Sequence, residues 1–103
     1  MSESPQIKAL KERYKKSLRE KSEIASNWSN VFKQGNTSEN SVAELSGWLH
    51  QLAGSAGMYE FDQIAQLCRD AMILLRETNV SALTVSETLD HISETMAAAA
   101  QLP

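Results

Sequence analysis

The sequence has few of the residues that interrupt helices or cross-link chains. Its 103 residues include four glycines, two prolines close to the termini, and one cysteine, Cys68. A single cysteine excludes an internal disulfide and favours an intracellular setting. No apolar run is long enough to span a bilayer, and the start of the chain lacks the form of a signal peptide. These absences predict a cytoplasmic protein without a membrane segment.

Length and composition predict a single domain over residues 1–103. The hydrophobic fraction of 42% is typical of a globular protein with a real core and argues against disorder. The initial methionine suggests a complete small protein, and a domain excised from a longer chain is the alternative.

Positive charge is concentrated near the start of a chain whose net charge is −3. Seven of the ten lysines and arginines lie between residues 8 and 21. Such a segment can bind nucleic acid or an anionic membrane, or steer an acidic protein partner. Because apolar residues continue through it at helical spacing, we interpret it as the solvated face of a helix and do not expect nucleic-acid binding.

Apolar residues recur at intervals of three and four along the whole chain, which predicts amphipathic helices and no strands. Capping and turn signals set their limits: Ser4 before Pro5, Gly35, Gly57, and Thr84 with Glu87 as a capping box. The predicted helices cover about 5–33, 39–56, 60–77 and 84–101. The inner stripe of the first is predicted to contain Ile7, Leu10, Tyr14, Leu18, Ala25, Trp28 and Phe32.

Four helices joined by short connections predict an all-α fold, an up-down-up-down antiparallel four-helix bundle. The short connection at Gly57 predicts a tight hairpin of the second and third helices. By their spacing, the large aromatic side chains are assigned mostly to the core: Trp28, Phe32, Trp48 and Phe61.

His50 lies off the apolar stripe of the second helix and is surrounded by very small residues. Its helical neighbours at three, four and seven positions are Ala43, Ser46, Gly47, Ala53, Gly54 and Gly57. A glycine inside a helix costs about 1 kcal/mol relative to alanine. This cleared surface therefore favours a histidine that a partner approaches closely. The alternative is a helix packed tightly against a neighbour through its glycines.

A neutral imidazole can attack a phosphoryl group and hold it as a labile phosphoramidate. Metal binding at His50 is not expected, because no other ligand lies three or four residues away. The second histidine, His91, has Glu87 and Glu94 nearby and is interpreted as an exposed helix-face residue. Cys68 lies on an inner stripe, where a thiol is usually a buried apolar group.

The stretch His50-Gln51-Leu52-Ala53-Gly54-Ser55-Ala56 resembles the His-x-Leu-Lys-Gly-Ser-(Ser/Ala) signature of histidine-containing phosphotransfer (HPt) domains. The resemblance implies a monomeric bundle that accepts a phosphoryl group on His50 from a receiver-domain aspartate or a hybrid sensor kinase. It would pass the group to another response-regulator receiver. The family resemblance also implies a phosphocarrier rather than an enzyme, without a cofactor of its own, the Mg²⁺ being in the receiver. A histidine-kinase dimerisation helix fits less well, because Gln51 and Gly54 stand where its acidic residue and proline usually occur.

One departure from the signature concerns position 53, where the family often has a lysine that can hold phosphoryl oxygens. Here the residue is Ala53. Arg69 and Arg76, seven residues apart in the third helix, could supply this charge or could be ordinary solvated arginines. The missing lysine leaves open a second function, a helical adaptor that docks a receiver or kinase through the same face without phosphotransfer.

Overall fold

Serine residues cap the N-termini of three of the four helices. The computed structural model describes residues 4–35, 37–77 and 80–102. The helices are α1 (Pro5–Lys33), α2 (Glu39–Met58), α3 (Asp62–Arg76) and α4 (Ala82–Ala100). Ser4, Ser38 and Ser81 each accept a hydrogen bond from the backbone N–H three residues later. Each thereby satisfies one of the free donors of its helix.

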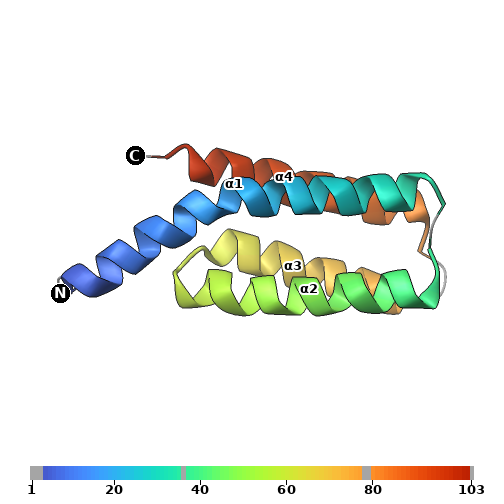
Figure 1. Cartoon of the computed structure of the whole chain (residues 1–103). Coiled ribbons are helices and arrows are strands. Elements are labelled where there is room, and N and C mark those ends of the chain that lie inside the picture. The colour runs from blue at the N-terminus through green and yellow to red at the C-terminus, as the bar shows by residue number, and fades with distance from the viewer. Residues whose placement is uncertain (1–3, 36, 78–79, 103) are drawn as a thin grey trace.

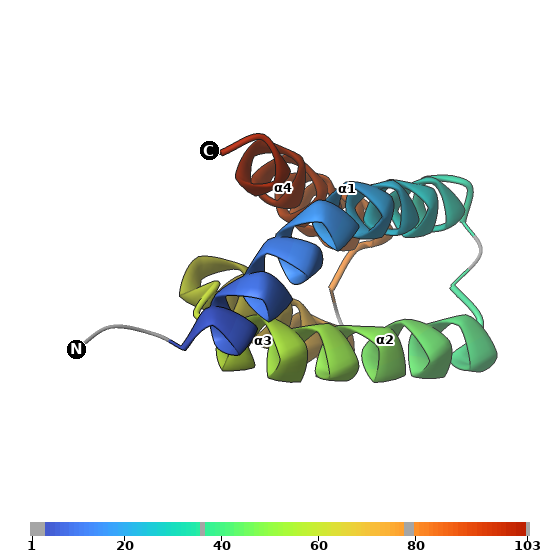
Figure 2. The same ribbon diagram turned by 60° about the vertical axis from the view of Figure 1, so that its left-hand side comes forward.

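The helices form the expected antiparallel bundle, with α1 packed on α4 and α2 packed on α3 (Figure 1). The α1–α4 pair lies over the α2–α3 pair (Figure 2). The molecule is a rod of 46 × 21 × 18 Å. The described residues contain no strand, and no helix they form is long and apolar enough to cross a membrane.

The predicted start of the fourth helix was wrong by two residues. Ser81, and not Thr84, is the N-cap: the backbone N–H of Thr84 donates to Ser81 Oγ at 3.0 Å. The hydroxyls of the two residues are also hydrogen-bonded, at 2.8 Å. Thr84 and Glu87 have capping-box spacing, but Ser81 caps the helix about one turn earlier. Ala82 and Leu83 are therefore part of the helix.

Replacing Ser81 with alanine is expected to lower the free energy of unfolding by about 1 kcal/mol, because an N–H of the first turn loses its acceptor. Thermal denaturation should show this as a fall in Tm of roughly 4–8 °C. Thr84→Ala should cost less, since Ser81 Oγ would still accept from the N–H of residue 84. A larger loss for Thr84→Ala than for Ser81→Ala would contradict this cap assignment.

The predicted limits of the second and third helices also need correction: the third runs from Asp62 to Arg76 rather than over about 60–77. Gly57 does not end α2, which continues to Met58. The left-handed residue of the turn is Glu60, with φ 69°. The N–H of Phe61 donates to the carbonyl of Ala56 at 2.8 Å, and that of Glu60 to the carbonyl of Gly57 at 3.2 Å, which is a Schellman motif. At the end of α1, Gly35 does have the predicted left-handed backbone, with φ 83°.

Leucine and other aliphatic side chains fill the centre of the bundle. The largest that are fully buried are Leu18, Leu45, Leu49, Ile64, Leu89, Ile92 and Met96. Of the four aromatic residues assigned to the core, Phe32 is buried. The other three, Trp28, Trp48 and Phe61, are partly buried and pack against the core cluster. Phe61 lies against Tyr14, whose hydroxyl is 2.6 Å from Ser55 Oγ and joins α1 to α2.

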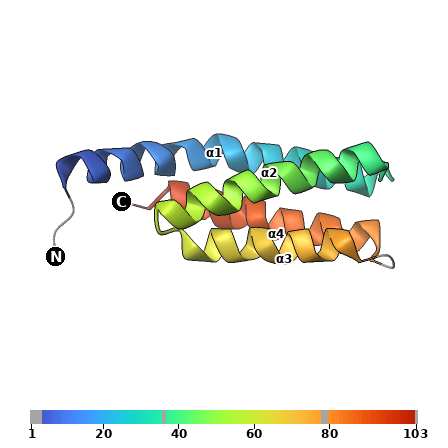
Figure 3. The same ribbon diagram turned by 90° about the horizontal axis from the view of Figure 1, so that it is seen from below.

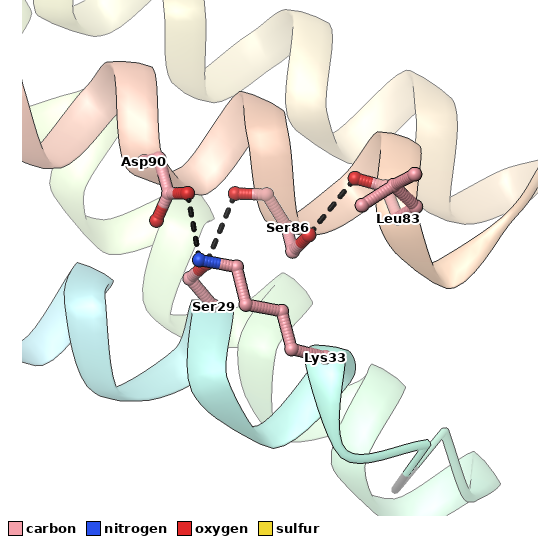
Figure 4. A network of polar contacts seen from close by, with 5 residues as sticks. All are labelled: Ser29, Lys33, Leu83, Ser86 and Asp90. Carbon is pink, nitrogen blue, oxygen red and sulfur yellow. Dashed lines mark hydrogen bonds and ion pairs between the residues drawn. The ribbon is translucent and has the colours of Figure 1, made fainter.

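Small serine residues let α1 and α4 approach closely, and their hydroxyls bond to backbone carbonyls. Ser29, which is fully buried, donates to the carbonyl of Ser86 at 3.0 Å, and Lys33 Nζ lies 2.9 Å from Asp90 Oδ2 (Figure 4). Ser93 donates to the carbonyl of Ser22 at 2.7 Å. The neighbouring Ser29 hydroxyl and, second, the Lys33 ammonium lower the pKa of the Asp90 carboxyl below its usual range. These buried hydroxyls therefore have hydrogen-bond partners. The bonds also fix the position of α1 along α4.

The start of α1 does not join the core as the apolar stripe predicted. Ile7 and Leu10 are 49% and 43% exposed. The first turns of α1 extend beyond the ends of the other helices (Figure 3), so these two residues are only about half covered. The stripe is buried only from Tyr14 onward.

Candidate functional site

The packing of α2 directs His50 away from the core. Leu49 and Leu52 are buried on one side of the helix, and His50 is exposed on another. Within the described parts of the chain, the imidazole of His50 has no hydrogen-bond partner. Its ring nitrogens are therefore open to a group that arrives from outside.

The glycines beside His50 face open space rather than a neighbouring helix. A Cβ built on Gly47 or on Gly54 would meet no atom of a neighbouring helix within 4 Å. Close packing within this chain therefore does not require either glycine, which removes the alternative interpretation of the cleared surface. What the glycines provide is room beside the imidazole.

His50 opens onto a hollow of about 480 Å³ between α2 and α3. Its walls are His50, Ala53 and Gly54 on one helix and Arg69, Met72, Ile73 and Arg76 on the other. The hairpin thus brings both arginines to the same hollow as the histidine.

The two arginines differ in how they are held. Arg69 Nη2 donates to Gln66 Oε1 at 3.1 Å, and Gln66 Nε2 in turn donates to Asp70 Oδ1 at 2.9 Å. Arg76, in the last turn of α3, has no such tether among the described residues. Arg76 also lines a second hollow, of about 360 Å³, which lies between the start of α2 and the end of α3. Arg76 is therefore the more available cation.

Comparison with known families agrees with this arrangement. A family model described as Hpt domain matches residues 9–102, nearly the whole chain. The chain belongs to the Hpt family. Neither the curated proteins nor the solved structures gave a significant match. Membership gives this Hpt domain a role in phosphotransfer within two-component signalling, with receiver domains or kinases as the kind of protein it interacts with.

The surface predicted to receive a partner is mostly accessible in this Hpt domain. Ala43, Gly47, Gly54 and Gly57 are exposed, and Ser46 is half-buried. Ala53 is the exception: it is 8% exposed and belongs to the core cluster. Its assignment to the open surface is corrected, because position 53 turns toward α3 and forms part of the wall of the hollow.

Sequence reasoning missed the apolar part of the site on α3. Met72 and Ile73 line the hollow with His50, and Ile73 is 54% exposed. The available signal was that Ile73 lies off the inner stripe of its helix, formed by Ile64, Cys68 and Ala71. An exposed aliphatic side chain beside the arginines is the kind of apolar surface that protein interfaces bury.

The sequence singled out two further side chains, Cys68 and His91. Burial raises the pKa of the Cys68 thiol to about 12, so it stays protonated and cannot act as a nucleophile at neutral pH. His91 is exposed on α4, as predicted. Within the described residues, no group of three or more His, Cys, Asp or Glu side chains could hold a metal ion.

Proposed function

We propose that this Hpt domain is a phosphorelay intermediate, which accepts a phosphoryl group on His50 from a receiver aspartate or a kinase and delivers it to another receiver. The observation that carries the proposal is the open space at Gly47 and Gly54 on either side of an exposed imidazole. A receiver must bring an aspartyl phosphate into line with a ring nitrogen, and larger residues here would obstruct it.

The transfer needs little chemistry from this chain. The lone pair of the outward ring nitrogen attacks phosphorus, and the N–P bond forms as the P–O bond to the aspartyl carboxylate breaks. The carboxylate leaves with the electron pair, and the imidazolium loses its ring proton to solvent. The reverse sequence passes the group to the next receiver. We propose that Mg²⁺ and the acidic residues that bind it belong to the receiver, and that this domain is a phosphocarrier without kinase activity.

In the proposal, Arg76 replaces the family lysine that is absent at Ala53. Its guanidinium lines the hollow beside His50, can reach phosphoryl oxygens with charge-assisted hydrogen bonds, and has no competing partner in the described chain. Arg69 lines the same hollow but is tethered to Gln66 at 3.1 Å. We therefore assign Arg76 the larger share of the stabilising charge and Arg69 a smaller one.

Arg76→Gln is expected to slow phosphoryl uptake from a phosphorylated receiver about five- to tenfold, a contact worth roughly 1 kcal/mol at a solvent-exposed site. Arg69→Gln should slow it by less. Single-turnover transfer, followed on phosphate-affinity gels, measures both rates. Arg19→Gln, an equal loss of charge at an exposed position on α1, is the control. Equal rates for Arg76→Gln and Arg19→Gln would refute the assignment.

The missing lysine supports a second candidate, a helical adaptor that binds a receiver or kinase without accepting phosphate. Incubation with each phosphorylated receiver of the source genome, followed by intact mass measurement at neutral pH, separates the two. A phosphate adduct supports the relay. Binding without an adduct from any donor supports the adaptor. The cytoplasmic location and the identity of the partners stay predictions.

A further inference from the structure

The first turns of α1 form an unpartnered segment that is both apolar and basic. This overhang, residues 5–10, extends past the end of the bundle (Figures 1 and 3). Ile7 and Leu10 continue the apolar stripe of α1 but are 49% and 43% exposed. Lys8, between them in sequence, has no acidic partner among the described residues, and the first turn of α1 carries no acidic residue.

A groove at the same end of the rod is apolar and acidic, and so is complementary to the apolar and basic overhang. This end groove is a hollow of about 670 Å³ between the start of α3 and the end of α4. Its apolar lining includes Leu102, which is 61% exposed. Three carboxylates line it: that of Glu60 is ion-paired with Lys11 of the same chain at 2.9 Å. The carboxylates of Asp62 and Glu94 have no basic partner among the described residues. The apolar members are Phe61, Ile64, Ala98, Ala99 and Leu102, and the acidic members are Glu60, Asp62 and Glu94.

We propose that the overhang of one copy docks in the end groove of a second copy. An apolar segment flanked by lysine fits an apolar groove flanked by carboxylates, since burial and charge both favour the contact. The overhang cannot turn back into its own groove, because α1 is one continuous helix from Pro5 to Lys33 that runs outward there. The occupant then comes from another molecule, and we assign it to a second copy because every copy carries the matching overhang.

Both surfaces lie at one end of the rod, so two copies related by a two-fold axis make the contact twice and close into a dimer. Each overhang has only six residues, which places the interface in the small, transient class. The bundle still closes within one chain, and folding does not depend on the dimer. The hollow beside His50, lined by residues 50–54 and 69–76, lies outside the end groove and stays accessible.

Sedimentation velocity over a concentration series tests this with the intact chain. The expected result is a reversible monomer–dimer equilibrium that weakens as salt is added. Lys8→Glu alone and Glu94→Lys alone should each weaken association about tenfold or more, because both contacts of the dimer then place like charges together. An equimolar mixture of the two variants should associate about as tightly as the unsubstituted protein. In that mixture, one contact is native and the other has its charges exchanged.

The matched control is Lys16→Glu, the same change of charge at an exposed position of α1 outside the overhang. It should leave the equilibrium unchanged. Ile7→Ser should weaken association without altering the circular dichroism spectrum, because the side chain is half-exposed in the single chain. A protein that stays monomeric at every concentration overturns the proposal, as does open-ended assembly, or failure of the mixed variants to recover dimerisation. None of these outcomes depends on phosphotransfer.

Discussion

Replacing His50 with glutamine is expected to abolish acid-labile phosphate uptake from a phosphorylated receiver. Glutamine has a similar length and polarity but no ring nitrogen that can form a phosphoramidate. The fold should be unaffected, because His50 is exposed and the structure gives it no hydrogen bond to a described residue. Uptake should fall below detection, while the circular dichroism spectrum and Tm stay within error of the unsubstituted protein.

The second histidine supplies the matched control. His91 is also exposed in the middle of a helix, but it lies on α4. His91→Gln should retain full uptake. Equal uptake by His50→Gln and the unsubstituted protein would refute the assignment of His50. Loss of uptake in His91→Gln alone would move the site to α4.

Gly54→Gln should change stability and transfer in opposite directions. A Cβ at this position meets nothing within 4 Å, so the helix gains roughly 0.5–1 kcal/mol from the loss of a glycine. The longer side chain, however, extends into the space through which a receiver approaches His50. A displacement of about 1 Å between reacting groups can cost a hundredfold in rate, and we expect a loss of that order in single-turnover transfer.

A size series separates steric obstruction from other effects of this substitution. Gly54→Ala should gain as much helix stability as Gly54→Gln but keep most of the transfer rate, because a methyl group adds little bulk. Chemical denaturation measures the first quantity, and the gel assay of phosphate transfer measures the second. If Gly54→Gln transferred as fast as Gly54→Ala, the open space would have no role in docking.

The parts of the fold that depend on local pattern could be predicted from the sequence. Side chains such as Leu45, Leu49 and Ile92 recur at helical spacing and are fully buried, because each amphipathic helix turns one apolar side toward the core of the bundle. The left-handed turn at Gly35 follows from its lack of a Cβ. His50 could be singled out because its neighbours are unusually small, a property of one helix alone.

Features that depend on how the helices are placed could not be predicted in this way. Ile7 and Leu10 match the core pattern, but they are exposed because the other helices end before them. Ala53 belongs to the small residues around His50, yet it is buried as part of the core cluster. The turn after α2 uses Glu60 at φ 69°, where residue preference favoured Gly57. Ser29 could not be recognised as a core residue from the sequence, because serine is polar. It can be buried because its hydroxyl donates to a carbonyl on α4.

The most direct test of the central claim is to locate the phosphate on the unsubstituted protein. After incubation with a phosphorylated receiver, intact mass at neutral pH gives the number of phosphoryl groups, and peptide mapping under non-acidic conditions gives their position. The account predicts one acid-labile group on His50, which moves to a second, unphosphorylated receiver when that protein is added. Phosphate on any other residue, or stable receiver binding with no adduct from any donor, would contradict it.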